Sequence, residues 1–186
     1  RQILRAVGEA HRLGVLHRDL KPDNVFIETL ADGTELVKVI DFGIAKRFDR
    51  QNDGLTSPGM VCGTPEYMSP EQVQGETLDP RSDVYALGVL LYEMIVGSPP
   101  FFGGGPAEIM LQHAEDEPIP PSEAAVELNI PASMDAIVLW SIAKHREDRI
   151  ESAEEFRRVL DSWLLVSSQP AAVRRIVRSS SASRST

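Results

Sequence analysis

The first forty residues change from a helical to a β-type pattern of apolar positions. Residues 3–13 are predicted to form an amphipathic helix that ends at Gly14, because apolar residues recur there at helical spacing: Ile3, Leu4, Val7, Ala10 and Leu13. Residues 25–30 and 36–40 are rich in β-branched and aromatic residues, and they flank Asp32 and Gly33. We therefore predict a β-hairpin with its turn at these two residues.

The second half of the chain has the pattern of several helices. Ser82 is a suitable N-cap for a helix over 83–96, which Gly97 would end; it is apolar nearly all round, so we expect it at the centre of the domain. Further helices are predicted over 106–114 and 134–144. Ser152 and Glu155 fit a capping box for a last helix, whose apolar stripe would comprise Phe156, Val159, Leu160, Trp163 and Leu164.

Two segments lack any period. Residues 44–80 are rich in Gly, Pro, Asp and Ser, which is typical of a long functional or disordered loop. Residues 167–186 contain seven serines, four arginines and no acidic residue, and we predict a disordered tail or linker. The rest, residues 1–166, is predicted to be one α+β domain, mainly α-helical, with a small hairpin at one end.

Composition limits the classes of function. The chain is 42% hydrophobic and 25% charged, which is typical of a soluble globular protein. Its net charge of -9 argues against general nucleic-acid binding. No apolar run reaches the roughly 20 residues of a membrane span. The single Cys62 is predicted to be a buried apolar residue, and His11, His113 and His145 to be surface groups, because their spacing does not suit a metal site.

The greatest density of charge lies in HRDLKPDN, residues 17–24, between two apolar runs. The predicted hairpin would bring the D-F-G at 41–43 back to this loop, so Asp19, Asn24 and Asp41 are expected to converge. Carboxylate and amide oxygens suit a hard cation such as Mg²⁺, which takes its remaining ligands from phosphate and water. Lys21 would neutralise charge on a phosphoryl group in transfer.

These motifs resemble those of eukaryotic-like serine/threonine protein kinases, in the C-terminal lobe of the catalytic domain. HRDLKPDN is similar to the catalytic loop, D-F-G to the metal-binding motif, and S-P-E at 69–71 to the A-P-E motif. The stretches GTPEYMSPEQ and SDVYALGVLLYEM look most like bacterial members. The Gly-rich loop and the V-A-I-K lysine of the N-terminal lobe are absent from these 186 residues.

The resemblance implies a role for each residue that matches a motif. Asp19 would be the catalytic base, and Asn24 and Asp41 would hold Mg²⁺. Lys21 resembles the lysine of the serine/threonine class, and Thr64 would support Asp19 and Lys21 and line the substrate site.

Other matches imply binding and structural roles. Phe26 would lie under the adenine ring of ATP, and Asp83 would brace the backbone of the catalytic loop. Glu71 and Arg149 are predicted to form a buried ion pair. Structural roles would also fall to His17, Phe42 and Gly43, with packing expected for His17.

A regulatory site is expected in the long loop. Thr56, with Ser57 as second candidate, is predicted to be an activating phosphorylation site. Arg18, together with Lys46 and Arg47, would form a basic pocket for the phosphate.

The resemblance implies transfer of the γ-phosphate of ATP to Ser or Thr hydroxyls of protein substrates. Two alternatives stay open: a non-catalytic binding module built on the lobe, and a truncated remnant. The expected partners are protein substrates and the missing N-terminal lobe, with no nucleic acid. We expect a cytoplasmic kinase domain, with a membrane reached only through segments beyond Thr186. Residues 1–186 alone are expected to transfer no phosphate at a useful rate, because half of the positioning groups are absent.

Overall fold

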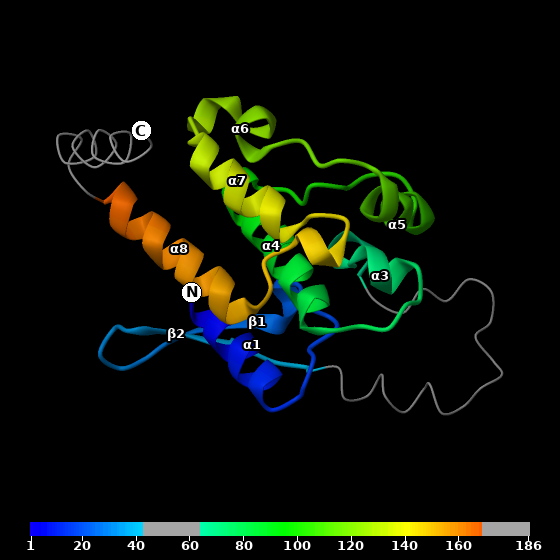
Figure 1. The fold of residues 1–186 in the computed structure, drawn as a ribbon. Helices are drawn as coiled ribbons and strands as arrows, with labels where there is room; N and C mark the ends of the chain where they lie inside the picture. The colour runs from blue at the N-terminus through cyan, green and yellow to red at the C-terminus, as the bar shows by residue number, and fades with distance from the viewer. Residues whose placement is uncertain (43–63, 169–186) are drawn as a thin grey trace, which may run out of the picture.

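The computed structural model describes residues 1–42 and 64–168, and these are mainly helical (Figure 1). One antiparallel sheet of two strands, β1 (Val25–Thr29) and β2 (Glu35–Val39), accompanies the helices. The predicted mixture of many helices with one hairpin is therefore confirmed for this part of the chain. The α-helices are α1 (Gln2–Arg12), α3 (Pro70–Val73), α4 (Pro80–Val96), α5 (Pro106–Glu115), α6 (Pro121–Ala124), α7 (Ala132–Ser141) and α8 (Ala153–Ser167). Short 3-10 segments are η1 (Pro22–Asn24), η2 (Pro65–Tyr67), η3 (Val126–Leu128) and η4 (Arg146–Asp148).

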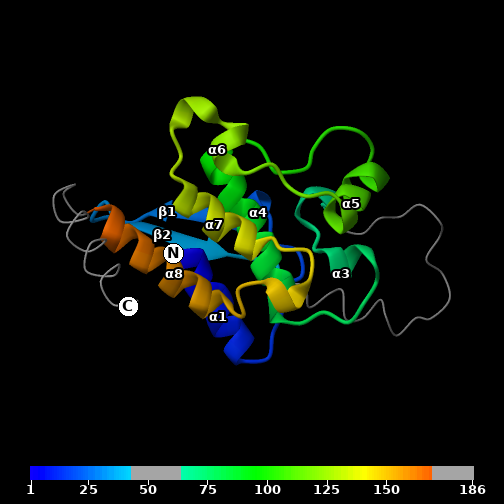
Figure 2. The same cartoon turned by 45° about the horizontal axis from the view of Figure 1, so that its top comes forward.

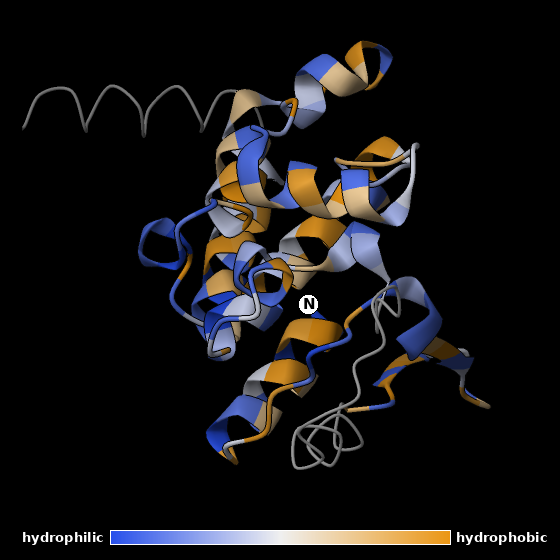
Figure 3. Cartoon of the chain, turned by 90° about the vertical axis from the view of Figure 1, so that its right-hand side faces the viewer, coloured by the Kyte–Doolittle hydropathy of each residue, from blue (hydrophilic) through white to orange (hydrophobic). Residues whose placement is uncertain are grey.

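Helix α4 is the centre of the fold, as its nearly uniform apolar pattern predicts. Every residue from 82 to 90 is buried, and the helix packs against α1, α7 and α8 (Figure 1). The surrounding helices show bands of apolar and polar residues along their length (Figure 3). Such helices bury one face and expose the other, so the core forms where their apolar faces meet α4.

The N-terminus of α4 differs from the prediction. The helix begins at Pro80, and its N-cap is Asp79, whose carboxylate accepts a hydrogen bond from the Arg81 amide at 2.7 Å. Proline is favoured at the first helical position because its missing N–H is not needed there. Ser82 lies inside the first turn, and its hydroxyl donates to Glu71 instead. The helix ends as predicted at Gly97, which has a positive φ of 92°.

The last two helices follow the prediction in part. Helix α7 runs over Ala132–Ser141 and not over 134–144. Ser152 caps α8 by accepting from the Glu155 amide at 3.1 Å, but the Glu155 carboxylate accepts from the Glu151 amide, so the capping box is only half formed. Leu164 is 40% exposed and is not part of the buried stripe. Residues 169–186 lie outside the described ranges, so the tail and its boundary stay predictions.

The hairpin is held against α1, as both Figure 1 and Figure 2 show. Its turn has Gly33 at a φ of 82°, and the Asp32 carboxylate accepts from the Thr34 amide at 2.9 Å. The side-chain amide of Gln2 donates to the Glu35 carbonyl and accepts from the Val37 amide, both at 3.0 Å. The side chain thus replaces a neighbouring strand at the free edge of β2 and fixes the hairpin to the helices.

Helix α4 and the end of α7 approach each other closely at Gly88. A Cβ atom on Gly88 would lie 2.3 Å from Ser141 Oγ and 2.6 Å from Ile142 Cγ2. The Ser141 hydroxyl donates to the Val138 carbonyl at 2.6 Å, which holds it in this position. The absence of a side chain at residue 88 is therefore a condition of this packing.

We predict that Gly88→Ala destabilises the protein by about 1–3 kcal/mol because the added methyl overpacks the core. This cost opposes the gain of roughly 1 kcal/mol that alanine brings to a helix interior. The measurement is urea unfolding followed by circular dichroism. The matched control is Gly8→Ala in α1, where the new Cβ would make ordinary contacts at 3.8 and 3.9 Å. An equal shift in the two variants would contradict the close approach.

Candidate active site

The two ends of the hairpin meet beside the 17–24 loop. The Ile40 amide donates to the Asn24 carbonyl at 3.0 Å, and His17 Nε2 donates to the Ile40 carbonyl at 2.8 Å. Asn24 Nδ2 also donates to the Asp19 carbonyl at 2.7 Å. These bonds join the loop to the residue that precedes Asp41, so the expected convergence of the loop and the D-F-G segment is present in the backbone.

His17 is a packing residue in this structure. Its side chain is fully buried, and its ring lies 4.7 Å from the Phe42 ring, centroid to centroid. With Nε2 bonded to the Ile40 carbonyl, the imidazole stabilises the start of the D-F-G segment. Gly43, the last residue of that motif, lies outside the described residues.

Asp83 of α4 holds the backbone of the charged loop. Its carboxylate, 2% exposed, accepts from the His17 and Arg18 amides, both at 2.8 Å. His11 Nε2 lies 2.7 Å from Asp83 Oδ2 and supplies a third contact. These contacts are the ones that a residue bracing the backbone of the loop would make, which is the role that the resemblance implies for Asp83. The surface location predicted for His11 is wrong, because its side chain is only 9% exposed. Local spacing could not reveal this, since the partner of His11 lies 72 positions away in the sequence.

Lys21 connects two of the predicted catalytic residues. Its Nζ donates to Thr64 Oγ1 at 3.0 Å and lies 3.7 Å from Asp19 Oδ2. The side chains of Lys21 and Asp19 are 22% and 23% exposed, so each keeps access to solvent or to a ligand. The three residues therefore form one cluster, in which an ammonium group lies between a hydroxyl and a carboxylate.

Asn24 and Asp41 carry the types of oxygen atom that suit a hard cation with further ligands from a bound phosphate. Asn24 is 5% exposed, and its amide nitrogen is committed to the Asp19 carbonyl, which leaves its oxygen as the ligand atom. Asp41 is exposed and has a left-handed backbone with φ 57°. Among residues 1–42 and 64–168, no group of three or more His, Cys, Asp or Glu side chains is placed to hold a metal. One carboxylate and one amide match the few protein ligands that Mg²⁺ takes beside phosphate oxygens.

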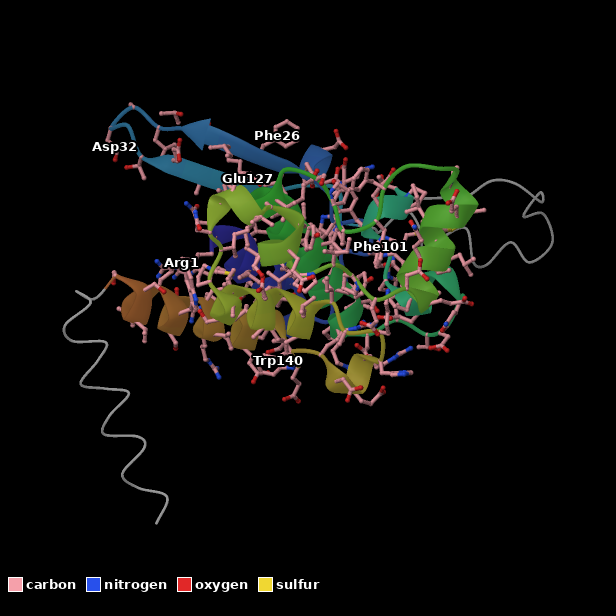
Figure 4. The ribbon with its side chains drawn as sticks, turned by 90° about the horizontal axis from the view of Figure 1, so that it is seen from above. Arg1, Phe26, Asp32, Phe101, Glu127 and Trp140 are labelled. Atoms are coloured by element: carbon pink, nitrogen blue, oxygen red, sulfur yellow. The ribbon has the colours of Figure 1, made fainter. Side chains whose placement is uncertain are left out.

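Directly after Asn24, the hairpin exposes one large apolar side chain on each of its two faces. Phe26 is 53% exposed and Ile27 66% exposed, and Figure 4 shows Phe26 on the outer side of the hairpin. A planar apolar ligand would find contact area there. Of the predicted regulatory site, Thr56, Ser57, Lys46 and Arg47 are outside the described residues, so the phosphorylation of this loop stays a prediction. Cys62 is outside them too, so its predicted burial also stays a prediction. Arg18, which is described, is partly buried and has a left-handed backbone with φ 68°.

The buried ion pair predicted between Glu71 and Arg149 is present. The guanidinium donates to both carboxylate oxygens, at 2.7 and 2.8 Å, and the two side chains are 3% and 0% exposed. Arg149 also lies over the Tyr85 ring at 4.9 Å, and the Ser82 hydroxyl donates to Glu71. The Arg149 guanidinium also donates to the backbone carbonyls of Arg81, Ala143 and Lys144. The pair therefore joins α3, α4 and the segment before α8.

The charge of Glu71 is maintained by its partners. Burial alone would raise the pKa of this carboxyl, but the hydrogen bonds and the charge of Arg149, with the bond from Ser82, hold it below its usual 4.5. A carboxyl whose pKa is lower in the folded protein stabilises the fold above the unfolded pKa. This contribution is lost as the pH falls through the folded value, below about 4.5.

A second buried cluster was missed by the sequence prediction. His113 of α5 is fully buried: its Nδ1 lies 2.8 Å from the Tyr85 hydroxyl, within hydrogen-bond distance, and its ring stands edge-on to Phe101 at 4.9 Å. Burial lowers its pKa to about 4, so it is neutral at physiological pH. Lys144 Nζ donates to the carbonyls of Gln112 and His113, both at 2.9 Å, and burial lowers its pKa to about 8. The predicted surface position is thus wrong for His113 and right for His145.

We predict that Glu71→Gln destabilises the protein by about 3–5 kcal/mol, because Arg149 would be left as an uncompensated buried charge. Thermal and urea unfolding at pH 7 measure the loss. The matched control is Glu154→Gln, which removes an exposed ion pair with Arg157 in α8 and should change the midpoint little. A midpoint for Glu71→Gln equal to that of the control would show that the buried pair contributes nothing.

Comparison with known proteins agrees with the geometry of this site. Residues 1–164 match the protein kinase domain family. The chain is 45% identical to serine/threonine-protein kinase pkn3 of Myxococcus xanthus over 163 residues. The aligned region covers 87% of the chain and 30% of that protein. It is 43% identical to serine/threonine-protein kinase PknB of Mycobacterium tuberculosis over 153 residues, and this aligned region covers 82% of the chain and 24% of that protein. The chain thus spans less than a third of the length of these relatives, and it belongs to the protein kinase domain family, with bacterial serine/threonine-protein kinases among its relatives.

Proposed function

We propose that the protein containing this chain is a serine/threonine protein kinase, which transfers the γ-phosphate of ATP to Ser or Thr hydroxyls of protein substrates. We also propose that this chain supplies the C-terminal lobe of the catalytic domain. The observation that carries the proposal is the cluster of Asp19, Lys21 and Thr64 beside Asn24, on a loop whose backbone is held by Asp83. The names of the relatives support the same activity.

Asp19 is the proposed general base. A base must lie within hydrogen-bond reach of the hydroxyl whose proton it accepts, and its position must not change during the reaction. The amide and carbonyl groups that surround Asp19 are held by His17, Asp83 and Asn24, so the carboxylate extends from a fixed backbone. Lys21, 3.7 Å from it, places a positive charge where negative charge develops on the phosphoryl oxygens.

Asn24 and Asp41 are the proposed ligands of Mg²⁺, and ATP is the proposed phosphate donor. These two residues would hold the ion, and the ion would neutralise negative charge on the phosphate groups of ATP. The amide bond to the Asp19 carbonyl orients Asn24, so the base and one metal ligand are positioned by the same contact. The exposed Phe26 offers an apolar surface for the adenine ring.

The substrate class and the partners are also part of the proposal. The Lys21–Thr64 hydrogen bond joins the catalytic loop to the segment before S-P-E, which is where a protein substrate would present its Ser or Thr hydroxyl. The N-terminal lobe of the catalytic domain is the proposed neighbour of the exposed hairpin face. Across residues 1–42 and 64–168, no helix combines the length and apolar composition of a membrane span. The cytoplasmic location of the domain stays a prediction.

We predict that Asp19→Asn in the full-length protein lowers kcat by about a hundredfold or more and leaves the affinity for ATP nearly unchanged. The amide cannot accept the proton of the substrate hydroxyl, whereas ATP makes its contacts elsewhere. Steady-state phosphorylation of a peptide substrate gives kcat, and nucleotide titration gives the affinity.

The control for this variant is Asp32→Asn, the same change of charge in the exposed hairpin turn. It should keep the kcat of the wild type. If Asp19→Asn also keeps that kcat, Asp19 is not the base. If the wild-type protein phosphorylates no Ser or Thr substrate with ATP and Mg²⁺, the proposed function itself is wrong.

A further inference from the structure

Gln72 connects the N-terminus of α3, where the S-P-E motif lies at 69–71, to the catalytic loop. Neither the sequence analysis nor the proposed mechanism assigns a role to this residue. Gln72 is the third residue of α3, and Ser69 is the N-cap of that helix. Gln72 Oε1 accepts from the Ser69 amide at 3.0 Å and from the Ser69 hydroxyl at 3.2 Å. Gln72 Nε2 donates to the Arg18 carbonyl at 2.8 Å, across 54 positions of sequence.

The Arg18 carbonyl is half of the peptide group that leads into Asp19. The other half is the Asp19 amide, which lies 3.3 Å from His17 Nδ1. Arg18 has a φ of 68°, in the left-handed region that is unfavourable for a non-glycine residue. Such a conformation persists only when its surroundings fix it. Asp83 fixes the amide of Arg18 at 2.8 Å, and Gln72 fixes its carbonyl.

Only a side-chain amide of this length makes both contacts. One end must accept from the N-terminus of α3, and the other must donate to a carbonyl oxygen. A glutamate at residue 72 would keep the accepting end, but it would direct a second acceptor at the Arg18 carbonyl. The preceding residue, Glu71, is bonded to Arg149 in the core, so α3 is itself firmly held. Gln72 therefore transmits the position of a fixed helix to the peptide beside the base.

We propose that Gln72 is a positioning residue for phosphoryl transfer: it holds the Arg18–Asp19 peptide in the orientation that directs the Asp19 carboxylate at the substrate hydroxyl. This inference rests on the proposed kinase function. Without the bond, the Arg18–Asp19 peptide keeps the long contact of its amide with His17 Nδ1, at 3.3 Å. The peptide group can then rotate, and the carboxylate moves from its reactive position. A displacement of about 1 Å at a reacting group is enough to lower a rate a hundredfold.

The test uses two variants of the full-length protein and one control. Gln72→Glu keeps the cap of α3 and removes the donor to Arg18, and Gln72→Met removes the donor without adding charge. Gln74→Glu is the matched control, because Gln74 is exposed and lies two positions away at the end of the same helix. Steady-state kinetics with ATP and a serine peptide give kcat and KM, and thermal unfolding reports the fold.

For both Gln72 variants we expect kcat to fall about tenfold or more, while KM for ATP stays within about twofold of the wild type. The control should keep both parameters within about twofold. Wild-type kcat in both variants would overturn the positioning role. A fall in kcat that is accompanied by an equal rise in KM for ATP, or by loss of the cooperative unfolding transition, would overturn it as well, because it would indicate general damage.

The outcomes also separate this inference from the proposed function. If the wild-type protein transfers phosphate and both Gln72 variants match it, only the positioning role fails. If the wild-type protein transfers no phosphate to any Ser or Thr peptide, the proposed function fails, and the positioning role fails with it.

Discussion

The carboxylate of Asp83 is the contact on which the arrangement of the charged loop depends. A buried carboxylate is unfavourable unless donors surround it, and here the two consecutive amides of His17 and Arg18 and the ring of His11 satisfy it. The same bonds attach the loop to α4, the most deeply buried helix of the described structure. Because α4 is fixed by the core, the backbone on either side of Asp19 takes its position from the centre of the fold and not from the surface.

The Glu71–Arg149 pair attaches α3 to the core, as the Asp83 carboxylate attaches the charged loop to α4. Helix α3 has four residues, and a helix of this length is not stable by itself in water. The bidentate bond to Arg149 attaches it to the segment before α8, and the Ser82 hydroxyl attaches it to α4. The loop and α3 are therefore anchored to the same central helix by two different charged groups, and the amide of Gln72 spans the distance between them.

Sequence reasoning found the elements with long patterns and missed the contacts between distant residues. The hairpin and α4 have clear signals, and the resemblance to protein kinases pointed to the Glu71–Arg149 pair. Helix α3 is too short for any periodicity, although Ser69 followed by Gln72 fits the S-x-x-Q form of a capping box and was available as a signal. His113 gave no such signal, because its burial depends on Tyr85 and on Phe101 from other segments. A histidine takes its environment from the tertiary fold, and spacing along the chain does not encode it.

The backbone strain of the described residues is concentrated at the candidate site. Within residues 1–42 and 64–168, three non-glycine residues have a positive φ. Arg18 precedes the proposed base, Asp41 is a proposed metal ligand, and Asn129 is in an exposed turn. Each left-handed residue costs about 1–2 kcal/mol. At Arg18 that cost is offset by two hydrogen bonds: the Asp83 carboxylate accepts from its amide, and the Gln72 side chain donates to its carbonyl. The surrounding helices therefore select the strained conformation. A backbone conformation that is fixed in this way sets the direction of a side chain before any ligand binds. Because the group is already in position, no free energy is spent on moving it during the reaction.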